Sequence, residues 1–575
     1  MKDQAAPIEA SCDLPPHEPS TGPSRSGWLW TLVGADAHAG ALLALAGVPV
    51  LGGIWALLSP GRIVSREMTW DFLFIFSGAW HLHYGHVAHV DFHTVFGVLN
   101  FLLLLAGFQI FGITPLAFLA SAVLVVLAVF TLASWAAWRR LPLIPACFFV
   151  VFVSLLILMP ANVGDMPNVF SFAMSYNRYG WSTLCILALI LYVPPRNGRG
   201  GDWIDMGAVG FLLVAMFYLK VTYFAAGLGL LGLAVLVCPH VRSRWQAWIA
   251  IGAALVANVL APYNHPYLAD IWEAAQAGAI RSGLSYHLLT FLPGAAEYAS
   301  YVAALAVAWL LWRRGQAPLH LPVAVAFIIL IGFFVLTQNA QPGGLPLCIV
   351  IAFLIYDQLR HRLPRETTGN LTLLMLAFMV FPLASIVISS ASLAAYNIRA
   401  RKPEGLSIVD RTQLRGLAVP AEEGDLLAAF SSGRVDPGLL GQVRLAGARY
   451  ELSAYEYVET ILEAAALLQG GQDGRHSRGG VAVLDQVNPL PFMLGREPPR
   501  GENLWSGPII PFQPAASLFA EADYVLVPKF STLSAWTSKA MTEYGPFLAE
   551  HYPFRKETPS WILFSRVSDA PSNQR

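Results

Sequence analysis

Two acids and five histidines lie close together between Thr69 and Gly97, in the sequence TWDFLFIFSGAWHLHYGHVAHVDFHTVFG. The acids are Asp71 and Asp91. A carboxylate beside membrane-embedded sequence can have its pKa tuned by burial and by neighbouring charges. Such a group can act as a general base and take the proton of an attacking hydroxyl. Asp71 and Asp91 are therefore candidate catalytic residues. The competing interpretation is that both are solvated loop acids.

Three of the histidines, His86, His89 and His93, have the spacing of one helical face. Together with Asp91, neutral imidazoles of this kind suit zinc, iron or manganese, so a divalent metal is a candidate cofactor. The alternative is that they form hydrogen bonds to phosphate or to sugar hydroxyls. We favour the alternative, because the other histidines of the chain are isolated and supply no second cluster.

Two further segments place a cation among polar aromatic residues. The run MSYNRYGW contains Arg178 after Tyr176 and Asn177, and a guanidinium at a helix start can bind phosphate. Lys220 interrupts an apolar run, where a lysine is costly unless it is paired or reaches water. We expect these cations to meet the phosphate of a lipid carrier. Interfacial anchoring for the first and snorkelling for the second are the alternatives.

The candidate residues for binding substrate or phosphate come from all of these segments, with one more just before the opening stretch and one from the run YNHPY. They are Arg66, His86, His89, His93, Tyr176, Asn177, Arg178, Lys220 and His265.

The composition indicates which elements must position these residues. The chain is 56% hydrophobic and 13% charged, whereas soluble proteins carry about 25% charged residues. The net charge is zero, so nothing suggests a nucleic-acid partner. Apolar runs of spanning length predict about twelve transmembrane helices. Their approximate ranges are 38–58, 94–111, 114–137, 143–160, 178–193, 206–220, 222–238, 246–262, 297–312, 319–336, 345–358 and 370–391.

Three regions follow from this pattern. Residues 1–36 are polar and rich in Pro and Ser, which predicts a disordered cytoplasmic tail. Residues 37–392 form the predicted transmembrane region. Charged residues return in 393–575, which predicts a soluble α/β domain. Its strand-like runs are Val481–Leu484, Tyr524–Val527 and Trp561–Phe564, and its main helical run is Ser453–Leu468.

Clusters of arginine predict which ends of the helices face the cytoplasm. From Arg196 onward they agree, and they place the last 183 residues on the opposite, extracytoplasmic side. The pair Arg139-Arg140 conflicts with this arrangement if both apolar segments before it cross the membrane. Either one segment between 94 and 160 does not span fully or the number of helices is wrong by one.

The acid soon after the first apolar segment, followed by G-x-x-x-H-x-DF-x-x-x-x-G, resembles the first loop of GT-C superfamily glycosyltransferases. The protein O-mannosyltransferases and aminoarabinose lipid A transferases are most similar in layout. The resemblance implies a GT-C-like fold, a polyprenyl-phosphate sugar donor bound from the bilayer, and a base or metal ligand at Asp71. The acid pair usual in that family is absent, because Phe72 follows Asp71.

These observations predict an inverting glycosyltransferase of the bacterial inner membrane. It would move a sugar from a polyprenyl-phosphate donor to an envelope glycan, lipid or protein on the outer face. Two other classes are a transporter or flippase of lipid-linked substrates, and a noncatalytic envelope scaffold. Transporters often show inverted repeats, which the sequence lacks, and a scaffold has no need of the acid-rich loop.

Overall fold

The computed structural model describes residues 39–163, 171–196, 202–277, 295–338, 344–360, 393, 395–421, 444–445, 448–449, 452–469, 479–507, 510–532 and 534–566. The tail predicted at 1–36 and the apolar segment predicted at 370–391 lie outside the described residues.

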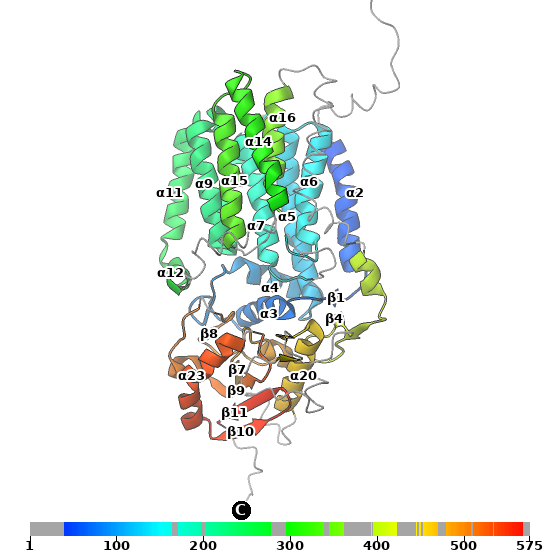
Figure 1. Ribbon diagram of the computed structural model, residues 1–575, viewed down its shortest axis with the longest axis vertical. Helices are drawn as coiled ribbons and strands as arrows, with labels where there is room; N and C mark the ends of the chain where they lie inside the picture. Colours follow the sequence, from blue (N-terminus) through cyan, green and yellow to red (C-terminus); the bar gives the residue numbers. More distant parts are fainter. Residues whose placement is uncertain are drawn as a thin grey trace, which may run out of the picture.

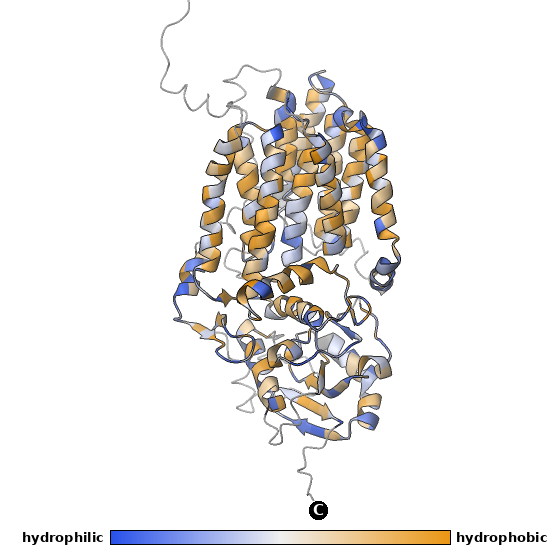
Figure 2. Cartoon of the chain, turned by 180° about the vertical axis from the view of Figure 1, so that it is seen from behind, coloured by the Kyte–Doolittle hydropathy of each residue, from blue (hydrophilic) through white to orange (hydrophobic). Residues whose placement is uncertain are grey.

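A bundle of apolar helices makes up one end of the molecule (Figure 1). Large hydrophobic side chains on its outside are exposed, among them Val48 at 72% and Leu236 at 70%. Figure 2 shows hydrophobic residues over most of the bundle, with hydrophilic ones at its upper end and in the lower part of the molecule. The bundle helices are α2 (Ala39–Leu58), α5 (Leu116–Arg140), α6 (Leu143–Leu158), α7 (Ser175–Tyr192), α8 (Asp202–Leu219), α9 (Val221–Val237), α11 (Trp245–Val259), α14 (Ala295–Arg313), α15 (His320–Gln338) and α16 (Cys348–Arg360).

Four helices of the described chain, α2, α5, α8 and α15, are long and apolar enough to cross a membrane. A fifth is added if α11 and the helical residues after it, bent by 59°, form one broken span. Helices α4, α6, α9 and α16 are also apolar but shorter. These helices indicate an integral membrane protein. The predicted break at Lys220 is confirmed, since α8 ends at Leu219 and α9 begins at Val221.

We call residues 59–98, between α2 and α4, the first loop. Its helix α3 (Thr69–His83) and the following helix α4 (Leu99–Phe111) lie beneath the bundle, between it and the C-terminal part of the chain (Figure 1). Every residue of α3 from Asp71 to His81 is buried. A helix with apolar residues on all sides is expected where it is covered on all sides. The structure encloses α3 between two layers of protein, the bundle and the C-terminal part of the chain.

Helix α4 accounts for the conflict over Arg139-Arg140. It has 13 residues, so it is roughly 20 Å long, which is shorter than the hydrocarbon core of a bilayer. The chain then turns at Gly112, whose φ is 73°, and enters α5. The predicted span at 94–111 is therefore too short to cross. Because α4 stays below the bundle, α5 carries Arg139-Arg140 to the far end.

Arginines from two of the basic clusters lie together at that far end, where they pair with shared acids. Asp202 and Asp205, at the start of α8, pair with the arginines at the end of α5. Arg139 bonds both acids, and Arg140 Nη2 lies 2.5 Å from Asp205 Oδ2. Arg244 also pairs with Asp202. Arg139 and Arg140 are 0% and 1% exposed, so their charges depend on these acids.

We call the described residues from 402 to 566 the C-terminal segment. A four-stranded sheet in it has the order β10-β11-β9-β7, with β7 and β9 parallel and the other pairs antiparallel. Its elements include α20 (Ala454–Gln469), β7 (Gly480–Val483), α21 (Leu490–Leu494), β9 (Ala522–Pro528), α23 (Ser534–His551), β10 (Phe554–Glu557) and β11 (Trp561–Ser565). The predicted strands at 481–484, 524–527 and 561–564 and the predicted helix at 453–468 are confirmed within two residues at each end.

Alternating residues of the central strand β9 face two different cores, as the period of a strand requires. Val525 and Val527 belong to a cluster with α23. Leu526 belongs to the larger core that includes α20 and the bundle. On the next strand, the indole of Trp561 donates to the carbonyl of Thr460 on α20 at 2.7 Å. The sheet therefore lies between α20 and α23.

Short strands join the first loop to the C-terminal segment. Strand β1 (Ile63–Val64) pairs in parallel with β4 (Leu417–Pro420), which also pairs with β3 (Leu406–Ile408). Strand β2 (Phe92–His93) pairs in parallel with β8 (Glu502–Asn503). Both ends of the first loop are thus fixed by residues hundreds of positions later in the chain.

We predict that Asp205→Ala destabilises the fold by about 3–5 kcal/mol, because it leaves two buried guanidinium groups without their shared acid. Thermal unfolding of the purified chain in detergent measures the loss. Asp202→Ala is the matched control, since the Asp202 side chain is 34% exposed, and it should cost about 1 kcal/mol or less. Equal effects of the two substitutions would contradict the prediction.

Candidate functional site

Asp71 is a buried carboxylate in the first turn of α3, and it is 6% exposed. Its Oδ2 accepts a hydrogen bond of 3.1 Å from the backbone N–H of Met174, at the start of α7. Burial raises the pKa of Asp71 to about 6, and the Met174 hydrogen bond and the charge of Lys220 partly oppose this rise. A carboxyl with a pKa in this range can accept a proton near neutral pH. The site therefore suits a general base.

The backbone on both sides of Asp71 is strained. Met68, just before α3, has φ of 49°, and Met174, just before α7, has φ of 51°. A left-handed conformation in a non-glycine residue costs about 1–3 kcal/mol and is kept where the surrounding structure enforces it, often at functional sites. The Met68 carbonyl accepts from the Asp71 N–H at 3.1 Å, and Met174 donates to the carboxylate. The two strained residues are those that hold Asp71.

Lys220 lies in the break between α8 and α9, with its ammonium near two side chains of the predicted site and near Phe96. Its Nζ is 4.9 Å from the ring centre of Tyr176 and 5.5 Å from that of Phe96. The same atom is 3.4 Å from Asn177 Oδ1. Cation–π contacts of this kind stabilise a partly desolvated ammonium. The structure therefore brings Tyr176, Asn177 and Lys220 together, and the charge of Lys220 lowers the pKa of Asp71.

Arg178 follows Asn177 on α7, and its guanidinium donates hydrogen bonds to backbone carbonyls. It is 1% exposed, and its Nη1 donates to the carbonyl of Ala161 at 3.0 Å and to that of Ala173 at 3.5 Å. These bonds join the end of α6 to the start of α7. Its predicted contact with phosphate stays a prediction, and the observed bonds indicate a structural role.

Asp91, the other candidate acid, has contacts that differ entirely from those of Asp71. Its Oδ2 accepts from the Val87 N–H at 2.7 Å and its Oδ1 is 3.7 Å from Arg500 Nε. Its backbone carbonyl accepts from the N–H of Gly501 at 2.6 Å. Asp91 thus closes a turn and holds the C-terminal segment.

Two more of the predicted binding residues are Arg66 and His265. Arg66 is half-buried in the connection between β1 and α3. His265 is exposed at the start of α12 (His265–Ala277).

His86 belongs to a buried chain of hydrogen bonds that ends on the C-terminal segment. Its Nδ1 is 2.9 Å from Nδ1 of His81, whose Nε2 is 2.7 Å from Glu502 Oε1. The amide of Asn488 donates to the other oxygen of Glu502 at 2.8 Å. Burial, and then the neighbouring His81, lower the pKa of His86. If His81 is protonated at Nε2, His86 must donate to it, which fixes both tautomers.

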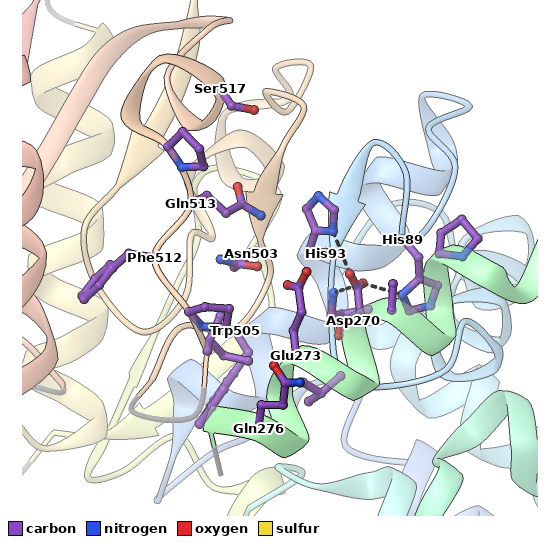
Figure 3. A pocket seen from close by; sticks show the side chains of 17 residues that line it. His89, His93, Asp270, Glu273, Gln276, Asn503, Trp505, Phe512, Gln513 and Ser517 are labelled. Carbon is purple, nitrogen blue, oxygen red and sulfur yellow. Dashed lines mark hydrogen bonds and ion pairs between the residues drawn. The ribbon is translucent and has the colours of Figure 1, made fainter. Parts of the chain in front are cut away.

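His89 and His93 converge on Asp270 of α12, an acid that the sequence did not single out. His89 Nδ1 is 2.8 Å from one Asp270 oxygen, and His93 Nδ1 is 2.9 Å from the other (Figure 3). The backbone N–H of Thr94 donates to Asp270 as well, at 3.2 Å. The hydrogen bond between His93 and Asp270 is the main cause of the raised pKa of His93. The predicted helical face is not formed, because His93 lies in strand β2.

Sequence reasoning missed Asp270 and Glu502, which orient four of the five histidines. Each is an isolated acid with no local pattern, and its histidine partners are 177 to 421 residues away in the chain. Only knowledge of the pairing between distant segments could have found them. Among the described residues, no group of three or more His, Cys, Asp or Glu is arranged to hold a metal ion.

No model of a protein family matches this sequence, and no curated protein matches it. Two solved structures are similar to the chain. One is ArnT from Cupriavidus metallidurans bound to undecaprenyl phosphate, with 12% identity and a TM-score of 0.46, over 93% of this chain and 100% of that one. The other is the Archaeoglobus fulgidus oligosaccharyltransferase with Zn and sulfate, with 11% identity and a TM-score of 0.36, over 92% of this chain and 74% of that one. Both of these structures are of GT-C superfamily members.

We predict that Glu502→Ala weakens the attachment of the C-terminal segment to the first loop. It removes the acceptor of two buried donors, on His81 and Asn488, and should cost about 2–4 kcal/mol. Thermal unfolding and limited proteolysis report the change. Glu497→Ala is the control. The Glu497 side chain is 64% exposed, and its distance of 3.5 Å from His86 is long for an ion pair, so we expect a small effect. An unchanged unfolding temperature in Glu502→Ala would contradict this prediction.

Proposed function

We propose that this chain is an integral-membrane glycosyltransferase that moves a sugar from a polyprenyl-phosphate donor to an acceptor hydroxyl. The acceptor is an envelope glycan, lipid or protein. The observation that carries the proposal is the buried carboxylate of Asp71, with the ammonium of Lys220 near enough for its charge to lower the pKa of Asp71. A base and a cation within electrostatic range of each other can serve the two ends of one displacement reaction.

In this mechanism Asp71 takes the proton from the acceptor hydroxyl. The acceptor oxygen forms a bond to the anomeric carbon as the bond from that carbon to the phosphate oxygen breaks. Attack opposite the leaving group inverts the anomeric configuration. The electron pair of the broken bond stays on the polyprenyl phosphate, and the proton stays on Asp71 until it passes to water.

Lys220 is the residue that we assign to the leaving phosphate. Its charge offsets the negative charge that grows on the phosphate as the bond breaks. Tyr176 and Asn177 position its ammonium through the contacts given above. Arg178 supports the same group by fixing the start of α7. A divalent metal, if one takes part, would supply further positive charge to the phosphate.

The arrangement of charges also supports a direction across the membrane. The arginine pair at the end of α5 and Arg244, just before α11, lie at the end of the bundle remote from α3, and such clusters favour the cytoplasmic side. We therefore assign Asp71 and the C-terminal segment to the extracytoplasmic side of a bacterial inner membrane. Residues 37–392 would form the catalytic region, and residues 393–575 a domain that closes it from outside.

We predict that Asp71→Asn lowers transfer by about 100-fold or more, because the amide cannot take a proton. Mass spectrometry of envelope glycans and glycolipids, in cells that lack the native gene and express each variant, measures the product. Asp91→Asn is the matched control. Its side chain caps a turn, and we expect most of the product to persist. The reverse pattern would move the base to Asp91, and product from both variants would overturn the mechanism.

The raised pKa of Asp71 predicts a pH dependence. The carboxyl is protonated below its pKa of about 6, so transfer should rise with pH through about 6 and then level off. The stability of the fold changes with pH in the opposite direction. A folded pKa above the unfolded value favours folding at low pH, and this contribution is lost as pH rises toward 6.

Asp71→Asn should therefore be at least as stable as the natural chain at pH 8. Release of polyprenyl phosphate, measured against pH, and thermal unfolding test the two statements separately. A rate that is flat from pH 5 to pH 8 would contradict the first.

A further inference from the structure

A cavity of about 790 Å³ lies between the first loop, helix α12 and the C-terminal segment. Figure 3 shows His93 and Asp270 on one side of it and Asn503, Trp505 and Gln513 on the other. It lies apart from the residues that contact Asp71.

The wall nearest the first loop is rigid. Asp270 uses both carboxylate oxygens on His89, His93 and the Thr94 N–H. With Nδ1 of His93 bonded to Asp270, its Nε2 is left for the cavity that the ring lines. Strand β8 lies next to β2, and in this parallel pair Asn503 is in register with His93. The polar groups are therefore held by strands and by a helix before any ligand binds.

The lining has the chemistry of a site for a carbohydrate. Glu273, Asn503 and Gln513 present planar carboxylate and amide groups, which can each bond to two neighbouring hydroxyls. Trp505 and Phe512 present aromatic rings, against which the C–H face of a sugar ring can pack. A few placed polar groups among apolar ones are typical of sites for small ligands.

The charge of the lining selects among carbohydrates. Glu273 is an exposed acid on the cavity wall, and among the described residues that line the cavity there is no lysine or arginine. An acidic sugar or a phosphate would meet Glu273 with no lysine or arginine to offset its charge, and the charge of a protonated His93 is already balanced by Asp270. A neutral sugar carries no charge for Glu273 to repel.

The cavity is connected to the Asp71 site through a short stretch of the first loop. His93 lines the cavity, whereas the ring of Phe96 lies under the ammonium of Lys220. Three residues of extended chain cover at most about 11 Å. Gly97 holds this stretch against α8: its N–H donates to the Leu219 carbonyl at 3.2 Å, and a Cβ there would lie 2.0 Å from the Tyr218 carbonyl oxygen.

We propose that this cavity binds a neutral glycan that forms part of the acceptor. The role as acceptor rests on the proposed function, whereas the binding of a neutral glycan does not. A bound oligosaccharide would extend from Trp505 along the 93–97 stretch, with its attacking hydroxyl toward Asp71.

The test uses the full chain in lipid nanodiscs, with saturation-transfer NMR of three trisaccharides. Maltotriose and tri-N-acetylchitotriose are the neutral probes, and trigalacturonic acid is the acidic one. We expect at least one neutral trimer to bind, and to bind more tightly than the acidic trimer. Trp505→Ala and Glu273→Gln should each weaken it by about tenfold. Trp203→Ala and Glu497→Gln, which are exposed residues elsewhere, should leave binding unchanged.

Failure of both neutral trimers to bind, preference for the acidic trimer, or unchanged binding in Trp505→Ala and Glu273→Gln would each overturn the proposal. The Asp71→Asn variant separates it from the proposed function. Glycan binding with undiminished transfer in Asp71→Asn would overturn the mechanism and leave the glycan site standing. Loss of transfer in Asp71→Asn, with binding unaffected by the cavity variants, would overturn the glycan site alone.

Discussion

Placing a carboxylate where water is excluded costs free energy, and the arrangement around α3 follows from that cost. Asp71 is kept in place by a backbone hydrogen bond from α7 and by the charge of Lys220. One group lies at the start of α7 and the other in the break between α8 and α9, so the bundle must be assembled before the carboxylate can be tolerated. The C-terminal segment covers the other side of α3. The site is a property of this contact between layers, and no single element contains it.

The same contact explains why histidines are abundant in the first loop. His81 and His86 reach Glu502, and His89 and His93 reach Asp270. Each imidazole is a polar group at a boundary between protein layers, where an unpaired donor is costly. The histidines therefore orient the first loop through their bonds to Glu502 and Asp270. Two of them, His89 and His93, form one wall of the cavity that we assign to a glycan.

The sequence predicts the local elements well and the long-range ones poorly. Strands β7, β9 and β11 have dense β-branched and aromatic runs that mark them. The break at Lys220 is visible because one charge interrupts an apolar run. In contrast, 94–111 has the hydropathy of a membrane span, although α4 is too short to cross and packs one side on α3 and α5. Hydropathy reports burial and cannot tell lipid from protein. Asp270 and Glu502 stand alone in the sequence, so their pairing with histidines could not be predicted.

The bond between His81 and Glu502 joins residues 421 positions apart. At about 5–20 residues per second, the ribosome needs roughly 20–80 s to make the intervening chain. During that time α3 is already outside the ribosome, with its buried polar groups and its strained start unsupported. The helix must then be sheltered by the bilayer surface or by other proteins. Completion of the site is thus a late event in the biogenesis of this protein, and cells have an interval in which the unfinished loop is open to proteases.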